Sequence, residues 1–159
     1  MGRWKNLPDD TLTNYLGELM LRQIIACKWD QMPSETKVIP IPPDRKRLIR
    51  RGFNPAGILS RLLAKRIKRE LCLDGLRLRH ELPVTKGLSH QGRQGRLKDA
   101  FEARRSKIAE SPVLLVDDVM TSGATVRAAS QSLLKAGAAS VSVAVLARVP
   151  FGQSSAGAS

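Results

Sequence analysis

Residues 113–126 constrain the fold of this chain more than any other part of its sequence. They read Val-Leu-Leu-Val-Asp-Asp-Val-Met-Thr-Ser-Gly-Ala-Thr-Val, in which four apolar residues predict a buried strand that ends in Asp117 and Asp118. Residues 122–136 then carry apolar positions at helical spacing, and residues 141–146 predict a further strand. The separation of the two strands fits a right-handed crossover, which joins parallel strands. The stretch therefore predicts an α/β fold with an open, mainly parallel sheet flanked by helices.

The same stretch predicts a site for a phosphorylated sugar. Ligands of an open parallel sheet bind at the carboxyl ends of its strands, where Asp117 and Asp118 are expected. The loop before the helix offers free backbone N–H groups, hydroxyls and the positive end of the helix dipole, which together favour a phosphate. This loop consists of Thr121, Ser122, Gly123, Ala124 and Thr125. Because two carboxylates would repel that phosphate, they must address sugar hydroxyls or a metal, and the pattern indicates a ribose 5-phosphate site.

Three other interpretations of this stretch can be compared with the sequence. A strand that ends in two acids also occurs in Walker B motifs, but the chain has no G-x-x-x-x-G-K-[ST] sequence to accompany it. A G-x-G-x-x-G sequence is absent too, which disfavours a dinucleotide-binding fold. A purely structural turn, in which acids complement a helix dipole, would explain the acids but not the glycine and hydroxyls that follow them.

The rest of the chain supplies further elements. Residues 38–41 predict a short strand that prolines end abruptly, and the loop predicted over residues 44–53 carries five Lys or Arg residues. A helix then begins with Asn54 as N-cap and Pro55 as first residue. Its apolar face predicts that the helix continues to about Leu71.

The length of 159 residues suits one domain. We expect residues 1–36 to form an N-terminal helical segment, whose helix starts after Asp9 and Asp10. Residues 37–150 hold the predicted sheet. Residues 151–159 are rich in Gly, Ser and Ala, and we expect them to be a disordered tail.

Positive charge is concentrated in the middle of the chain. The sequence holds 27 Lys and Arg against 14 Asp and Glu, a net charge of +13. Residues 45–107 contain 19 of the basic and five of the acidic residues, so the flanks are near neutral. Such a field favours phosphate-rich partners: nucleic acid, nucleotides, pyrophosphate or anionic lipid. The alternative is that these residues are solvated helix and loop faces that aid solubility.

Composition excludes several classes of protein. The apolar runs are far shorter than the roughly 20 residues of a membrane span, and the polar residues 1–10 contain no secretory core. The two cysteines, Cys27 and Cys72, are too few for a disulfide framework or a four-cysteine zinc site. Both are expected to be packing residues on helices. We therefore expect a cytoplasmic protein without a transmembrane segment.

Residues 113–126 look like the phosphoribosyl pyrophosphate (PRPP) motif of the type I phosphoribosyltransferases. Further segments that match one family among these enzymes are Val38–Pro42, Arg50–Asn54, Leu88–Ser89, Arg93, Ala100–Phe101 and Gly137–Arg148. Together they resemble the ComF/GntX family, which is associated with bacterial competence and the use of external DNA. The resemblance covers residues 38–148, and it implies a type I phosphoribosyltransferase-like sheet.

The resemblance implies a role for each matching position. Asp117 and Asp118 would hold the ribose 2′- and 3′-hydroxyls as catalytic residues, and residues 121–125 would bind the 5-phosphate. The basic residues that would face pyrophosphate are Arg45, Lys46, Arg47, Arg50 and Arg51. Arginine forks stabilise such charge, and Mg²⁺ bound to PRPP would share that load. Ser89 and Arg93 would belong to a mobile loop that closes over the site.

The chain departs from the family pattern at several positions. Pro55 replaces the glutamine that ends the Arg-Gly-Phe-Asn signature. Thr85 and Arg96 stand where the family's mobile loop has glutamine and asparagine. The family's N-terminal four-cysteine module has no counterpart here, so we expect a shortened member.

These observations lead to three functional hypotheses. We expect a PRPP-binding, phosphoribosyltransferase-like protein of the ComF type, linked to DNA uptake or the use of external DNA, with an unidentified acceptor. The alternative is a non-catalytic basic adaptor that binds nucleic acid or competence-machinery proteins. A third hypothesis is that PRPP sensing controls a protein partner. The sequence leaves the oligomeric state open.

Overall fold

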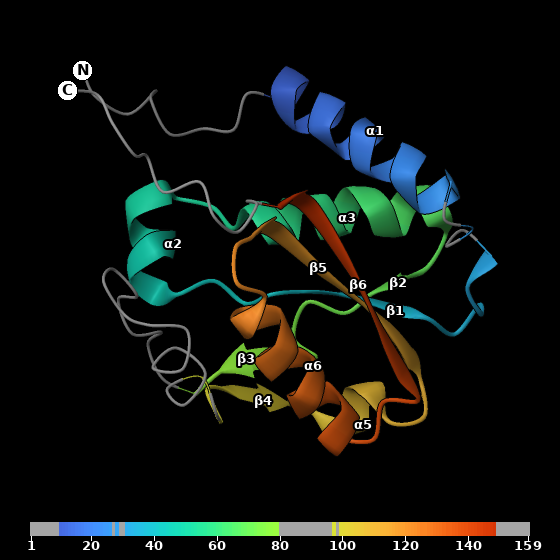
Figure 1. Ribbon diagram of the computed structural model, residues 1–159, viewed down its shortest axis with the longest axis vertical. Helices are drawn as coiled ribbons and strands as arrows, with labels where there is room; N and C mark the ends of the chain where they lie inside the picture. The colour runs from blue at the N-terminus through green and yellow to red at the C-terminus, as the bar shows by residue number, and fades with distance from the viewer. Residues whose placement is uncertain (1–9, 27, 29–30, 80–96, 98, 149–159) are drawn as a thin grey trace.

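A four-stranded parallel sheet forms the centre of the molecule (Figure 1). The structure is a computed structural model, and it describes residues 10–26, 28, 31–79, 97 and 99–148. In spatial order, the strands are β2 (Glu70–Leu71), β1 (Lys37–Pro40), β5 (Pro112–Met120) and β6 (Ser140–Arg148). A separate antiparallel ribbon pairs β3 (Leu76–Leu78) with β4 (Phe101–Ala103). The predicted fold class, with its mainly parallel sheet, is confirmed.

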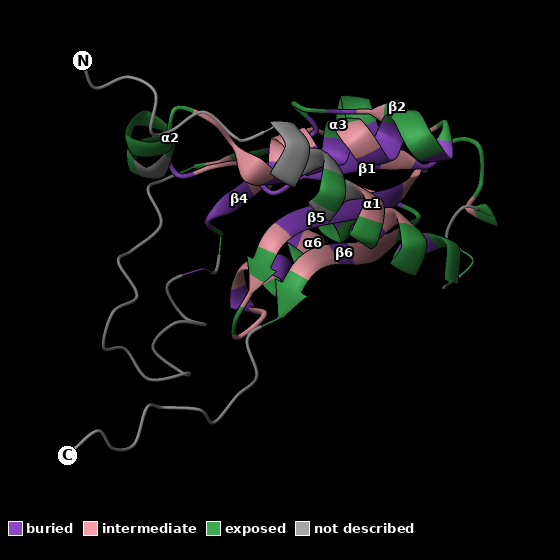
Figure 2. Ribbon diagram, turned by 90° about the horizontal axis from the view of Figure 1, so that it is seen from above, coloured by how far each residue is buried: buried purple, intermediate pink, exposed green. Residues whose placement is uncertain are grey.

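Helices cover both faces of the sheet (Figure 1, Figure 2). On one face pack α1 (Asp10–Ala26) and α3 (Pro55–Ile67). On the other face lie α6 (Ala124–Lys135) and the short α5 (Arg105–Ile108), together with the β3–β4 ribbon. A short helix, α2 (Arg45–Arg51), follows the carboxyl end of β1. The central strands are therefore enclosed between two layers.

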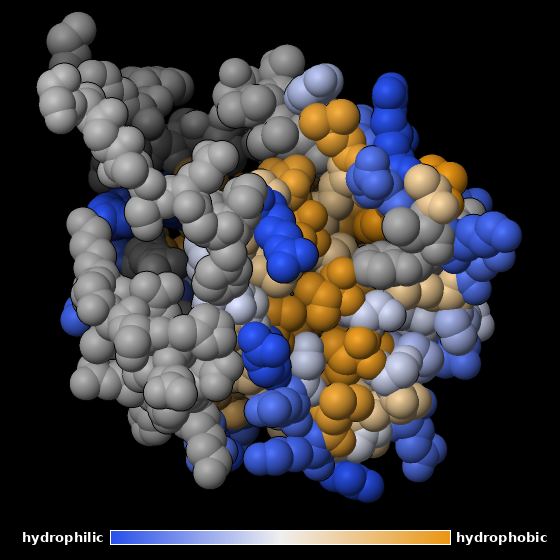
Figure 3. Space-filling model, viewed as in Figure 1, coloured by the Kyte–Doolittle hydropathy of each residue, from blue (hydrophilic) through white to orange (hydrophobic). Residues whose placement is uncertain are grey.

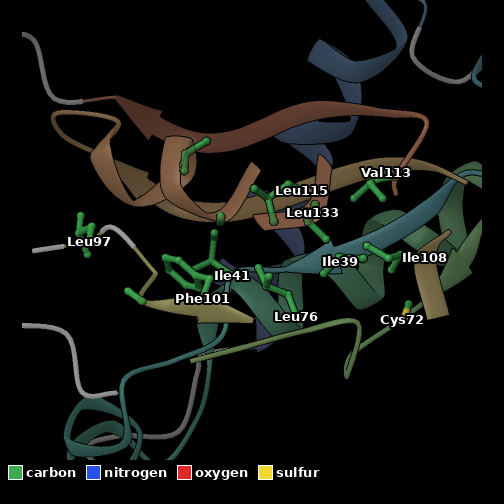
Figure 4. Close-up of a cluster of buried hydrophobic side chains, with 14 of the residues drawn as sticks. Ile39, Ile41, Cys72, Leu76, Leu97, Phe101, Ile108, Val113, Leu115 and Leu133 are labelled. Atoms are coloured by element: carbon green, nitrogen blue, oxygen red, sulfur yellow. The ribbon is translucent and has the colours of Figure 1, made fainter. Parts of the chain in front are cut away.

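Alternate residues of the central strands face the two layers, as the two-residue period of a strand requires. Val38 of β1 and Leu114 of β5 pack among α1 and α3. Ile39 and Leu115 pack on the opposite face, with α6 and the β3–β4 ribbon (Figure 4). All four residues are fully buried. Burial on both faces explains why these strands read as continuous apolar runs rather than as alternating patterns.

The edge of the sheet at β6 is covered on one face by α1. Met20 and Ile24 of α1 belong to the same buried cluster as Ala144 of β6. A band of apolar residues crosses the face of the molecule that Figure 3 shows. Among the side chains of α1 that the structure describes, those of Tyr15, Leu19 and Ile25 are large, apolar and exposed.

Two predictions about the basic region are wrong. The predicted loop over residues 44–53 contains α2, which Asp44 caps by accepting a hydrogen bond from a backbone N–H two residues further on, at 2.8 Å. The helix predicted to reach Leu71 ends instead at Ile67. The reason is that Lys68 adopts a left-handed conformation, with φ 54°, and the chain then enters β2.

Other predictions concern the cysteines and the ends of the chain. Cys72 is buried as expected, but it follows β2 rather than lying on a helix, and its N–H donates to the carbonyl oxygen of Val38 at 2.9 Å. Cys27 and the predicted tail over residues 151–159 lie outside the described residues. Within the part that is described, no helix has both the length and the apolar character needed to cross a membrane. The predicted division at residues 36 and 150 stays a prediction.

Candidate functional site

The carboxyl ends of β1 and β5 form a topological switch point. The two strands are neighbours in the sheet. However, the connection from β1 leads through α2 to α3 on one face, whereas β5 leads to α6 on the other. The two connections diverge and leave a crevice between the strand ends, which is where open α/β sheets bind their ligands.

Prolines mark the end of β1 beside this crevice. β1 stops at Pro40, which lies beside Val116 of β5. Pro42 and Pro43 follow, and neither has an N–H to donate to a neighbouring strand. β5 continues beyond this point along β6. Within the described residues, the two acids of β5 therefore lie on a segment that pairs with β6 alone.

The crevice is a cleft of about 430 Å³. It joins residues 42–56, which follow β1, to residues 117–125 at the end of β5. Its polar lining comprises the acids Asp44, Asp117 and Asp118 together with Arg51, Asn54, Thr121 and Thr125. Apolar lining comes from Pro42, Leu48, Phe53, Leu97 and Val119. The cleft thus combines opposite charges and hydroxyls beside an apolar wall, as a small-molecule site does.

The two adjacent acids face different neighbours. Asp117 is 8% exposed, and its Oδ1 accepts a hydrogen bond from the backbone N–H of Asp118 at 2.9 Å. The side chain of Asp118 is 31% exposed, and its Oδ2 lies 3.6 Å from Nη1 of Arg51 on α2. Successive side chains of a strand point to opposite faces, yet both acids line the same cleft at the carboxyl end of β5.

The segment between β5 and α6 turns at Gly123. This glycine has φ 72°, in the left-handed region that favours glycine. Thr121 and Thr125 line the cleft on either side of the turn, and Oγ of Ser122 accepts a hydrogen bond from the backbone N–H of Ala124 at 3.4 Å. α6 begins at Ala124 rather than at Ser122, so the turn precedes the helix. Since Thr121 and Thr125 line the cleft, the turn and the positive end of the helix dipole both lie there.

Helix α2 brings one basic side chain, that of Arg51, to the cleft. Arg51 lines the cleft, and Arg50 beside it is exposed in the last turn of α2. The backbone of Arg47 belongs to the same helix. Ser89 and Arg93, which were expected in a mobile loop, lie outside the described residues. The structure thus brings one of the predicted pyrophosphate residues, Arg51, next to Asp118, one of the two predicted sugar-binding acids.

The sequence interpretation missed the contribution of Asp44 and Asn54 to the cleft. Asp44 is only 8% exposed and caps α2. Asn54 occupies the N-cap position of α3 as predicted, but its side chain makes no capping bond. Instead, its Nδ2 donates to the carbonyl oxygen of Ile41 at 3.4 Å, which ties α3 to the end of β1. Aspartate before a helix is an N-cap signal that could have revealed Asp44, whereas no local signal reveals the contact of Asn54.

The cleft offers oxygen donors rather than a dedicated metal site. Among the described residues, no group of three or more His, Cys, Asp or Glu side chains is arranged to hold a metal ion. The carboxylates of Asp44, Asp117 and Asp118 nevertheless line the cleft. Mg²⁺ is commonly held by one or two carboxylates together with substrate phosphates. The residues present therefore fit a magnesium ion that arrives with a phosphorylated ligand.

Sequence comparisons connect the chain with one domain family and with a group of bacterial proteins. The family model described as phosphoribosyl transferase domain matches residues 48–155. Competence protein F of Haemophilus influenzae is 37% identical over 131 residues, which cover 77% of this chain and 55% of that protein. DNA utilization protein YhgH of Escherichia coli O157:H7 is 29% identical over 140 residues, which cover 86% of this chain and 60% of that protein. The chain thus spans little more than half the length of these curated relatives.

Solved structures share the fold at low sequence identity. The allosteric regulatory enzyme of purine biosynthesis superposes with a TM-score of 0.54 and 19% identity, over 84% of this chain and 25% of that chain. A hypoxanthine phosphoribosyltransferase from Staphylococcus aureus superposes with a TM-score of 0.52 and 14% identity, over 88% of this chain and 76% of that chain. At these identities the similarity shows the fold alone.

Proposed function

We propose the function of this chain from one premise: it belongs to the phosphoribosyl transferase domain family, as a ComF-type member. The cleft between β1 and β5 binds PRPP, and the protein transfers the phosphoribosyl group to an acceptor that is still to be identified. One observation carries this proposal: the acids of β5, the turn before α6 and Arg51 of α2 line the same cleft.

In the proposed complex, each part of PRPP meets a complementary group. The 5-phosphate binds at residues 121–125, where backbone amides and the helix dipole favour an anion. The ribose hydroxyls donate hydrogen bonds to the carboxylates of Asp117 and Asp118. The pyrophosphate faces α2, where Arg50 and Arg51 offer charged donors in fork geometry. The two positive subsites therefore take the phosphate groups at the two ends of PRPP, and the carboxylates between them take the uncharged sugar.

The proposed transfer exchanges one bond at C1 of the sugar for another. The bond from C1 to the pyrophosphate oxygen breaks, and its electron pair leaves with the pyrophosphate. A nucleophilic atom of the acceptor forms the new bond, and its proton passes to water. Asp117 and Asp118 stabilise the positive charge that develops on the sugar, while Arg51 stabilises the leaving group. Mg²⁺ bound with PRPP supplies further neutralisation of the pyrophosphate charge.

The names of the sequence relatives support the cellular part of this proposal. Competence protein F and DNA utilization protein YhgH are named for competence and for the use of DNA. We accordingly place this chain in DNA uptake or the use of external DNA, acting in the cytoplasm. Residues 37–150 are the proposed phosphoribosyltransferase-like domain.

Calorimetric titration with PRPP in the presence of Mg²⁺ tests the binding proposal. Hydrogen bonds to a charged group are stronger than neutral ones, so Asp118→Asn is expected to weaken PRPP binding about tenfold or more. Binding of inorganic phosphate, which has no diol, should change by less than about twofold. Asp74→Asn is the matched control, since Asp74 is exposed and does not line the cleft. Its carboxylate pairs with Arg104 instead, at 2.7 Å. A folded wild-type sample that does not bind millimolar PRPP contradicts the proposal.

A second candidate function, a non-catalytic adaptor that binds nucleic acid, is favoured by the exposed basic surface of α2 and α3. The exposed basic residues on these helices include Arg45, Lys46, Arg50, Arg51, Arg61, Lys65 and Arg66. Such a surface binds phosphates with little sequence preference, and its affinity falls steeply with salt. This function predicts that Arg50→Ala weakens DNA binding and that added PRPP has no effect on it. Displacement of DNA by PRPP would favour the transferase instead.

A further inference from the structure

Arg51 and Asp118 form an ion pair that bridges the cleft. Nη1 of Arg51 lies 3.6 Å from Oδ2 of Asp118, and the two side chains are 46% and 31% exposed. Arg51 is the last residue of α2, whereas Asp118 lies near the end of β5. The cation that the proposed function assigns to pyrophosphate therefore contacts the anion that it assigns to the ribose hydroxyls.

The ion pair between these two side chains competes with the contacts that each of them would make to a ligand. A guanidinium group keeps its charge in proteins, so Arg51 leaves the carboxylate of Asp118 only for another good acceptor. Pyrophosphate is such an acceptor, because its anionic oxygens can accept two parallel hydrogen bonds from one arginine. A ribose diol is uncharged and must compete for a carboxylate that Arg51 already neutralises.

We propose that the Arg51–Asp118 ion pair makes the site selective for a pyrophosphorylated ribose over ribose 5-phosphate. PRPP draws Arg51 to its pyrophosphate and thereby releases Asp118 for the sugar. Ribose 5-phosphate has no group at C1 that can do so, and it binds against the intact ion pair. This inference rests on the proposed function of the cleft and adds to it the residue that discriminates between the two sugar phosphates.

The size of the expected effect follows from the geometry. The ion pair is longer than a hydrogen bond and partly exposed, and such pairs contribute little free energy. Its competition should therefore weaken ribose 5-phosphate binding by only about two- to fivefold. The contact between Arg51 and pyrophosphate involves charged donors and acceptors on both sides, so its loss should weaken PRPP binding by about tenfold or more.

The variant Arg51→Gln tests the proposal, because the proposal predicts that the affinities for two ligands change in opposite directions. We expect the variant to bind ribose 5-phosphate about two- to fivefold more tightly and PRPP about tenfold or more weakly, in calorimetric titrations at one salt and Mg²⁺ concentration. A simple loss of positive charge cannot give this result, since it would weaken the binding of both anions. Because an exposed ion pair contributes little to stability, the thermal unfolding temperature should stay close to that of the wild type.

Two further variants separate the ion pair from the general field of α2. Arg50→Gln removes the same charge from the neighbouring position, and we expect it to weaken the binding of both ligands. In an Asp118→Asn background, Arg51→Gln should no longer tighten ribose 5-phosphate binding, because the partner is already gone. If the wild type binds PRPP and Arg51→Gln weakens the binding of both ligands, the selectivity proposal is overturned and the proposed function stands. If the wild type binds neither ligand, the proposed function fails, and the selectivity proposal fails with it.

Discussion

Ser60 lies inside α3 with a side chain that is completely buried. Its Oγ has no hydrogen-bond partner in the described part of the chain. A buried hydroxyl without a partner destabilises the folded state, and alanine is the better helix former. We therefore predict that Ser60→Ala raises the free energy of unfolding by about 1 kcal/mol in urea denaturation. Ser130→Ala, at a half-buried position of α6, is the control, and an equal gain in both variants would contradict this explanation.

Cys72 gives the stability of the protein a dependence on alkaline pH. Burial raises the pKa of the Cys72 thiol, and the Asp74 carboxylate, whose Oδ1 lies 3.9 Å from Sγ, raises it further. The unfolded thiol ionises with a pKa of about 8.5. Because the folded pKa is the higher one, the resulting stabilisation is complete below about pH 8.5 and is lost as the pH rises toward the folded pKa.

This linkage is measurable as a difference between two variants. In a Cys27→Ser background, the free energy of unfolding should fall more steeply above about pH 8.5 when Cys72 is present than when it is replaced by alanine. The comparison cancels the other groups that titrate in this range. Parallel pH profiles for the two proteins would show that burial does not perturb this thiol.

At the scale of elements, the turn between β5 and α6 depends on a glycine. Gly123 has φ 72°, and a Cβ there would lie 3.5 Å from Sδ of Met120, so the conformation rather than crowding opposes substitution. We predict that Gly123→Ala lowers the free energy of unfolding by about 1 kcal/mol and also weakens binding of inorganic phosphate.

Gly137 provides the control for this prediction. It has φ 96° and follows the end of α6, outside the cleft lining, and a Cβ there would lie 3.0 Å from Nη1 of the flexible Arg105 side chain. Gly137→Ala should therefore cost a similar stability without changing phosphate affinity. If both variants leave phosphate binding unchanged, the turn at Gly123 is not the phosphate site.

The elements that could be predicted from the sequence are those whose signals are local. β5, the turn and α6 follow one another within residues 112–135, and each has its own period or turn residue. The sequence interpretation missed α2 because its basic residues show no apolar period, although Asp44 caps it. β2 was missed because Leu71 continues the apolar face of α3, and only the conformation of Lys68 breaks it.

The pairing of β3 with β4 lay beyond the sequence interpretation for a different reason. The two strands are short, and more than 20 residues of chain separate them. Their pairing is set by packing on α6 and the sheet, where Leu76 and Phe101 join one buried cluster (Figure 4). Such a contact has no local signature.

At the scale of the whole molecule, the cleft forms because two segments that are distant in the sequence meet at the carboxyl ends of neighbouring strands. The acids and the turn could be predicted because they are contiguous and because parallel strands bind ligands at their carboxyl ends. That Arg51 would reach Asp118, and that Asp44 and Asn54 would join the same cleft, follows from β1 and β5 being neighbours. Strand order is a property of the assembled sheet, so the presence of the acids and the turn at the cleft could be predicted, whereas its other lining residues could not.

The central claim is most directly tested by a crystal structure of the protein with Mg²⁺ and a PRPP analogue that cannot react. We predict that the ribose hydroxyls lie within hydrogen-bond distance of Asp117 and Asp118, and that the 5-phosphate contacts the backbone of residues 121–125. Arg51 should then contact the pyrophosphate instead of Asp118. A sugar bound elsewhere, or acids that do not contact it, would contradict the account.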